Sequence, residues 1–151
     1  MRPNLYKISE IQLQYKPKIK ASERPVLKCT EDVYQMFKQY WNMDLIELVE
    51  EFKVILLNRS NAVLGILNVS TGGLTGVIAD PRIIFGAALK SGANGLLLCH
   101  NHPTMTLKPS EQDIALTEKI KRAGVFLDIN ILDHLIINED NYFSFKGAGL
   151  L

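Results

Sequence analysis

Two histidines and one aspartate in a short stretch of this chain have the residue types and spacing of a metal site. His100 and His102 are separated by one residue, and Asp113 follows soon afterwards. Two imidazole nitrogens and one carboxylate oxygen leave a fourth tetrahedral position for water, as in catalytic zinc sites. Structural zinc sites more often use several cysteines, whereas this chain has only Cys29 and Cys99, far apart in sequence. The first interpretation is therefore a zinc hydrolase.

Each part of this pattern also has an ordinary structural explanation. A His-x-His pair by itself is a weak indicator of a metal. Ser110 and Asp113 have the spacing of a capping box, in which both side chains bind free amides of a helix's first turn. A carboxylate used in that way would not be free for zinc. The metal site is favoured by four features that occur together: a strand end, the histidine pair, Pro103 and an acidic residue in the first helical turn.

The elements around these residues are expected to bring them together. Residues 96–99 are wholly apolar, which is typical of a central strand, and they run directly into His100. Binding and catalytic residues collect at the carboxyl edge of such sheets. A helix is expected over residues 110–123, closed by Gly124, so that Asp113 can face back toward the strand end.

The remaining hydrophobic patterns alternate between helices and strands. One helix is expected from Thr30, which can cap it, to about residue 41, and another over residues 81–90, with Asp80 as cap and Pro81 in the first position. Further strands are expected over residues 52–57, 63–69, 77–78, 125–132, 135–138 and 142–145. Interleaved helices and strands predict an α/β or α+β class, with a mixed β-sheet flanked by helices.

Composition bounds the organisation of the chain. Its 151 residues, 47% hydrophobic, are enough for one domain, and a net charge of +1 gives no general attraction to nucleic acid or membrane. Residues 1–28 are nevertheless basic and are expected to form an N-terminal arm or linker, with an edge strand or extended segment over residues 5–15. The domain is expected over residues 29–151. Two lone cysteines and no apolar leader or membrane span favour the cytoplasm.

The spacing of the site residues resembles a known motif. The JAMM motif reads His-x-His, seven residues, Ser, two residues, Asp, and His100, His102, Ser110 and Asp113 match it without insertion. The resemblance implies one zinc ion per chain, with His100, His102 and Asp113 as ligands. It also implies that the Ser110 hydroxyl donates to the oxyanion that develops on the scissile carbonyl. Helix capping remains the alternative for that serine.

A narrower resemblance covers about residues 29–151. Residues 100–103, 109–110 and 132–137 are similar to the bacterial RadC-type JAB/MPN domain, and residues 50–58 resemble the strand that opens it. The resemblance implies a cytidine-deaminase-like JAB/MPN fold and a zinc metallohydrolase site of the isopeptidase type.

The same resemblance implies that a glutamate near the opening strand acts as general base. Glu50 matches that glutamate by its place two residues before Phe52. Glu51 is the alternative, because a one-residue slip moves a side chain to the other face of a sheet. Asp133 and His134 form a further polar pair, which can support a metal ligand from behind.

One local departure from the family pattern concerns the loop after the histidines. The family usually reads His-Asn-His-Pro-Ser-Gly, whereas this chain has Thr104 and Met105 in the last two places. If the glycine is needed for a positive φ, Met105 is strained there or the loop differs.

The function implied is hydrolysis of a peptide or isopeptide-like amide in a peptide or protein substrate that the sequence does not identify. Two alternatives stay open: a DNA-repair-associated nucleic-acid-binding module that uses the basic arm, and a catalytically silent JAB scaffold for protein–protein interaction. A nucleobase deaminase is disfavoured, because the chain lacks the His-x-Glu and Pro-Cys-x-x-Cys pattern of that chemistry.

Overall fold

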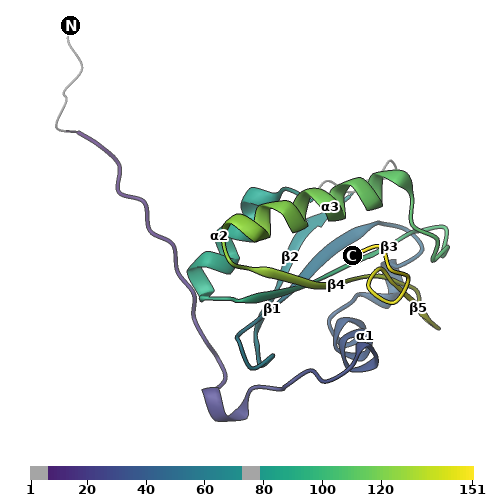
Figure 1. Ribbon diagram of the computed structural model, residues 1–151, viewed down its shortest axis with the longest axis horizontal. Coiled ribbons are helices and arrows are strands. Elements are labelled where there is room, and N and C mark those ends of the chain that lie inside the picture. Colours follow the sequence, from purple (N-terminus) through teal and green to yellow (C-terminus); the bar gives the residue numbers. More distant parts are fainter. Residues whose placement is uncertain (1–6, 73–78) are drawn as a thin grey trace, which may run out of the picture.

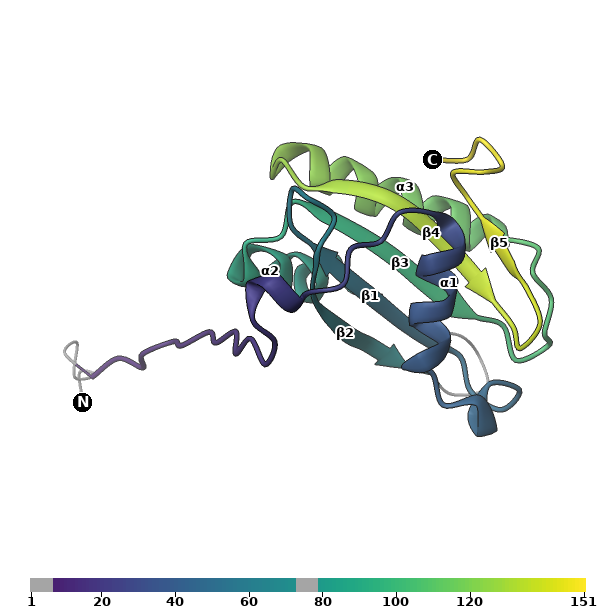
Figure 2. The ribbon, with the colours of Figure 1, turned by 90° about the horizontal axis from the view of Figure 1, so that it is seen from below.

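The computed structural model describes residues 7–72 and 79–151. In these ranges the helices are α1 (Thr30–Gln39), α2 (Pro81–Ser91) and α3 (Glu111–Phe126), with short 3-10 helices at Ala21–Glu23 and Met43–Leu45. The strands are β1 (Glu51–Leu57), β2 (Val63–Thr71), β3 (Gly95–Asn101), β4 (Asn130–Ile137) and β5 (Tyr142–Ser144). They form one sheet, with α1 on one face and α2 and α3 on the other (Figures 1 and 2). The predicted mixed sheet flanked by helices is confirmed.

The sheet places β3 at its centre, in the order β2-β1-β3-β4-β5. Neighbouring strands are antiparallel except β3 and β4, which are parallel. All seven residues of β3 are buried, as expected for a strand covered on both faces. Phe52 of β1 pairs with His100 of β3. Because paired residues point to the same face, even-numbered residues of these two strands share the face covered by α2 and α3.

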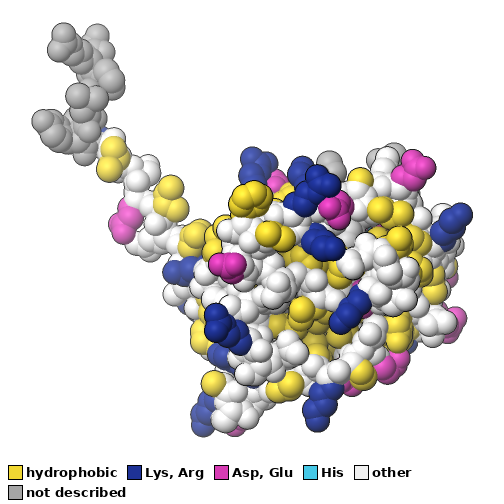
Figure 3. Space-filling view, in the orientation of Figure 1, with side chains coloured by type: hydrophobic (Ala, Val, Ile, Leu, Met, Phe, Trp, Pro, Cys, Tyr) yellow, Lys and Arg dark blue, Asp and Glu magenta, His cyan; other side chains and the backbone are white. Residues whose placement is uncertain are grey.

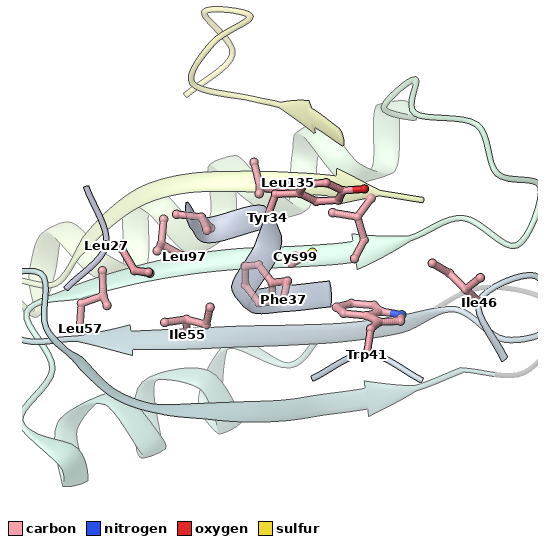
Figure 4. Packing of buried hydrophobic residues seen from close by; sticks show 12 residues of the cluster. Leu27, Tyr34, Phe37, Trp41, Ile46, Ile55, Leu57, Leu97, Cys99 and Leu135 are labelled. Carbon is pink, nitrogen blue, oxygen red and sulfur yellow. The ribbon is translucent and has the colours of Figure 1, made fainter. Parts of the chain in front are cut away.

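Two hydrophobic clusters hold the layers together. Figure 4 shows the first, in which Phe37 of α1 and Trp41 just after this helix pack against Ile55, Leu97 and Leu135 of three neighbouring strands. The second joins the opposite face of the sheet to α2 and α3. The sheet therefore has a packed core on both sides, which fixes the orientation of β3 and the residues that follow it.

Helix α2 has the ends that its sequence predicts. The Asp80 carboxylate accepts a hydrogen bond of 2.9 Å from the amide of Arg82, and Pro81 occupies the first turn, where its missing amide hydrogen costs nothing. Gly92 closes the helix with a φ of 70°, a conformation that glycine adopts without strain.

Several predicted boundaries differ from those of the structure. The cap of α1 is Cys29 rather than Thr30, because Asp32 completes a capping box with the backbone of Cys29. Helix α3 runs past Gly124 to Phe126, so residues 125–126 are helical. The strands expected over residues 125–132 and 135–138 are one strand, β4, which runs through the polar pair at its centre.

Residues 7–15 form an extended arm without strand pairing, and it projects away from the body (Figure 1). The Tyr15 hydroxyl donates to the Leu64 carbonyl of β2 over 2.6 Å, which attaches the base of the arm to the sheet edge. Hydrophobic side chains are visible along the arm, and lysines and arginines are spread over the body beside it (Figure 3). The strand expected at residues 77–78 lies outside the described residues. Every helix in the described ranges is too short or too polar to span a lipid bilayer.

Candidate metal centre

Strand β3 and helix α3 bring the predicted ligands to one point. The Nε2 atoms of His100 and His102 are 3.0 Å apart. Asp113 places Oδ1 at 3.2 Å from Nε2 of His100 and Oδ2 at 3.2 Å from Nε2 of His102. Two donors bound to one tetrahedral zinc ion at its usual bond lengths lie about 3.4 Å apart. The three side chains therefore have nearly the mutual spacing of ligands that share one ion.

The first turn of α3 aims the Asp113 carboxylate. The amide of Ser110 donates to Asp113 Oδ2 over 2.7 Å, and the amide of Asp113 donates to Ser110 Oγ over 3.1 Å. This is the capping box that the spacing predicted as an alternative to a metal site. The structure combines both interpretations, because the oxygen that receives the Ser110 amide also lies beside His102.

The ring of His102 presents a lone pair to this point. Its Nδ1 lies 2.9 Å from the carbonyl oxygen of Thr106, and a carbonyl can only accept, so Nδ1 carries the proton. In the neutral ring Nε2 is then a bare acceptor. It faces His100 Nε2 and a carboxylate oxygen, and acceptors this close repel one another unless a cation is shared between them. The donor set therefore fits a bound cation.

The charges of these groups favour a shared cation as well. Without a metal ion, a proton on Nε2 can take the cation's place, and its hydrogen bond to the Asp113 carboxylate is the main cause that raises the pKa of His102, although burial opposes it. Burial would raise the pKa of Asp113, but contacts with His100 and His102 and the Ser110 amide outweigh it and hold this pKa well below its usual range. The carboxylate is therefore ionised across the physiological pH range.

Glu50 lies beside the histidines, directly before β1. Glu50, His100 and His102 form a group that could hold a metal ion, since one ligand atom from each lies within 4.8 Å of the others. Burial raises the pKa of the half-buried Glu50, and the two histidines partly counter this. Asp113 approaches both rings to 3.2 Å, so it is better placed than Glu50 to be the third direct ligand.

Glu51, the alternative to Glu50, points to the other face of the sheet. Its Oε1 lies 3.3 Å from Lys53 Nζ, and that ammonium lies 5.1 Å from the ring centre of Trp41, on the α1 side. A separation of one residue along an extended strand puts the two glutamates on opposite faces. Only Glu50 shares a face with His100.

Asn101, between the two histidines, fixes the backbone around Glu50. Its side chain is fully buried and accepts a hydrogen bond of 2.8 Å from the Glu51 amide. It also donates to the carbonyls of Val49 over 3.0 Å and Ile46 over 2.7 Å. Sequence reasoning missed this residue, because its partners lie some fifty residues away and no local signal indicates them.

His134 and Thr117 lie behind His100. His134 Nε2 is 2.8 Å from His100 Nδ1, and Thr117 Oγ1 is 2.6 Å from His134 Nδ1. Burial lowers the pKa of His134 well below its ordinary value, and the neighbouring His100 acts in the same direction. Asp133 faces away and binds Ser144 Oγ over 2.6 Å. The two residues of the predicted polar pair therefore have different partners, and of the two only His134 contacts a candidate ligand. Thr117 was not predicted.

Met105 stands where the family pattern has glycine, and it adopts a left-handed backbone conformation. Its φ is 62°, in the left-handed region that side chains other than those of asparagine and aspartate seldom occupy. The Met105 amide donates to the His102 carbonyl over 2.8 Å, and the Asn138 side chain donates to the Met105 carbonyl over 3.1 Å. The loop thus keeps a glycine-like turn in spite of its side chain, which packs against the α1-side core.

Comparison with known proteins identifies the family of this chain. A family model described as the RadC-like JAB domain matches residues 27–150. The chain belongs to this family. A UPF0758 protein of Flavobacterium johnsoniae is 52% identical over 101 residues, which are 67% of this chain and 44% of that protein. A UPF0758 protein of Syntrophomonas wolfei is 36% identical over 129 residues, 85% of this chain and 55% of that protein.

The RadC-like JAB domain described here thus spans about half the length of the curated relatives it matches.

Proposed function

We propose that this RadC-like JAB domain is a zinc-dependent metallohydrolase of the JAMM type that cleaves a peptide or isopeptide-like amide bond. The observation that carries the proposal is the convergence of His100, His102 and Asp113, whose donor atoms lie 3.0–3.2 Å from one another. Three protein ligands leave one tetrahedral position for solvent, which distinguishes catalytic from structural zinc sites.

Glu50 is the proton carrier in this proposal. When bound, a zinc ion supplies a Lewis acid that makes water a nucleophile at neutral pH. One ligand atom of Glu50 lies within 4.8 Å of a ring nitrogen of each histidine, so its carboxylate is within reach of a water molecule held at the metal site. It takes a proton from the attacking water and delivers it to the amine nitrogen as the C–N bond breaks. Its raised pKa suits both transfers, because the carboxyl group must hold the proton between them.

Ser110 stabilises the oxygen of the scissile carbonyl. Its Oγ accepts from the Asp113 amide, so its own hydroxyl hydrogen is left to donate. The residue is exposed beside the ligands and can meet a substrate. Donation to an oxygen that gains negative charge in the transition state contributes about 3 kcal/mol in comparable sites. Capping and catalysis therefore use different lone pairs and hydrogens of one hydroxyl group.

The direct test is a chelator-controlled activity screen. The full chain, loaded with one equivalent of zinc, would be offered peptides and conjugates joined through a lysine ε-amine. We expect turnover that a chelator removes, that added zinc restores, and that is absent in Glu50→Gln. Stoichiometric zinc without hydrolysis of either class would contradict the enzyme and favour the scaffold. Salt-dependent DNA binding lost on removal of residues 1–28 would favour the nucleic-acid module.

A further inference from the structure

A chain of hydrogen bonds runs from His100 through two buried side chains to the backbone of α3. His100 Nδ1 meets His134 Nε2 at 2.8 Å, and His134 Nδ1 meets Thr117 Oγ1 at 2.6 Å. The Thr117 hydroxyl lies 2.6 Å from the main-chain carbonyl of Asp113, one helical turn earlier. The chain thus connects one candidate ligand to the backbone of another.

The direction of every proton in this chain follows from its last member. A carbonyl oxygen only accepts, so the single hydroxyl hydrogen of Thr117 is donated to Asp113. Thr117 Oγ1 must then accept from His134, which places the His134 proton on Nδ1. The neutral His134 ring therefore has a bare Nε2, which accepts from Nδ1–H of His100. His100 is left with its lone pair on Nε2, the atom that faces His102 and Asp113.

Among the residues that the structure describes, the side chains of His134 and Thr117 have no other hydrogen-bond partners. His134 is 0% exposed and Thr117 is 1% exposed, so bulk water cannot satisfy a different tautomer. The His134 ring stacks on Phe145 with centroids 4.6 Å apart, and the His100 ring stacks on Phe52 at 5.9 Å. These stacked contacts fix the planes of both rings and oppose rotation.

We infer that Thr117 and His134 are positioning residues, which hold His100 in the tautomer that offers Nε2 to a metal ion. This inference rests on the metal site of the proposed function. Ligating histidines usually donate their second N–H to a carboxylate or a carbonyl. Here the acceptor is a neutral histidine, whose own tautomer depends on a threonine. The hydroxyl of Thr117 therefore determines, through His134, which nitrogen of His100 can bind a metal ion.

The matched variants are Thr117→Val and Thr117→Ser. Valine keeps the shape of threonine but removes the hydroxyl, so zinc binding would leave the Nδ1 proton of His134 without an acceptor. We expect zinc affinity, measured by chelator competition, to fall about 10–100-fold in Thr117→Val. Thr117→Ser keeps the hydroxyl and should stay within about threefold of the wild-type affinity. Equal affinity of the folded valine variant and the wild type would overturn the inference.

A second measurement needs no variant and no activity. Long-range ¹⁵N–¹H correlation spectra of the metal-free wild-type chain report which imidazole nitrogens carry protons. We expect a protonated Nδ1 and a bare Nε2 for His134, and a bare Nε2 for His100. A proton on Nε2 of either ring with Nδ1 bare would refute the inference. A wild-type chain that binds no zinc would refute the proposed function instead, and the spectra would still decide the tautomers.

Discussion

The side chain of Asn101 accepts a hydrogen bond of 2.8 Å from the backbone amide of Glu51. The same side chain donates to the carbonyl of Val49, so it binds the chain on both sides of Glu50. Asn101 lies between the two candidate histidine ligands. Three consecutive residues where β3 ends therefore have two tasks. His100 and His102 supply proposed ligands, and Asn101 between them positions the proposed base, Glu50.

Replacing Asn101 by leucine should destabilise the domain. Leucine has a similar size but leaves the buried Glu51 amide and two carbonyl groups without partners. Each such group costs about 1–3 kcal/mol, and we expect a total loss of about 3 kcal/mol in the free energy of unfolding, measured in urea. The exposed Asn68→Ala should change it by less than about 0.5 kcal/mol. Equal stability of the two variants would contradict this role.

Glu50→Gln and Glu51→Gln should have opposite effects. Glu50→Gln keeps the shape of the site but cannot carry a proton, so zinc should stay bound while turnover falls about 10²–10⁴-fold. Glu51→Gln leaves the Lys53 ammonium buried without an ionised partner, which should cost about 3 kcal/mol of stability and spare turnover in the folded protein. Zinc content, steady-state rates and urea unfolding check these outcomes. Loss of turnover only in Glu51→Gln would move the base to that residue.

At position 105, glycine should give a more stable protein than alanine, which reverses the usual order of stability. Both Met105→Ala and Met105→Gly lose the packing of the thioether chain, but only glycine adopts a φ of 62° without strain. We expect the glycine variant to be more stable than the alanine variant by about 1 kcal/mol in urea unfolding. An alanine variant of equal or higher stability would show that the loop moves out of the left-handed conformation.

Gly124 and Gly86 are both helical, and alanine should affect them in opposite directions. A Cβ at Gly124 would lie 2.3 Å from the carbonyl oxygen of Ile129, so the end of α3 would have to move away from the start of β4. We expect Gly124→Ala to lower the free energy of unfolding by about 2 kcal/mol. Gly86 has open space around its Cβ position, and Gly86→Ala should raise stability by about 0.5–1 kcal/mol. Thermal or urea unfolding of both variants checks the pair.

Local signals were sufficient for some elements. The Asp80–Pro81 start of α2 depends on side chains next to the backbone that they cap, and β3 was visible as an apolar run. Gly124 misled the prediction, since glycine is common at helix ends, whereas here it allows close contact with Ile129. The polar pair within β4 suggested a break, but Asp133 is buried with partners from the end of the chain, including the Lys146 amide at 3.0 Å.

In the candidate site, too, some residues could be predicted from the sequence and others could not. The convergence of His100, His102 and Asp113 could be predicted, because these residues are close in sequence, at the end of one strand and in the first turn of the next helix. The choice between Glu50 and Glu51 could not, because it depends on the register of β1 with β3, in which Phe52 pairs with His100. Thr117 carried no separate signal, since its partner His134 lies seventeen residues away in sequence.

The zinc content of the wild-type chain and two variants tests the central claim most directly. The proteins would be saturated with zinc, passed through a desalting column and analysed for metal per chain. We predict one zinc per wild-type chain, with stoichiometric zinc lost in both His102→Ala and Asp113→Asn. Glu50→Gln, the matched control, should retain one. Full zinc occupancy in folded His102→Ala and Asp113→Asn would contradict the ligand set, and with it the proposed hydrolase.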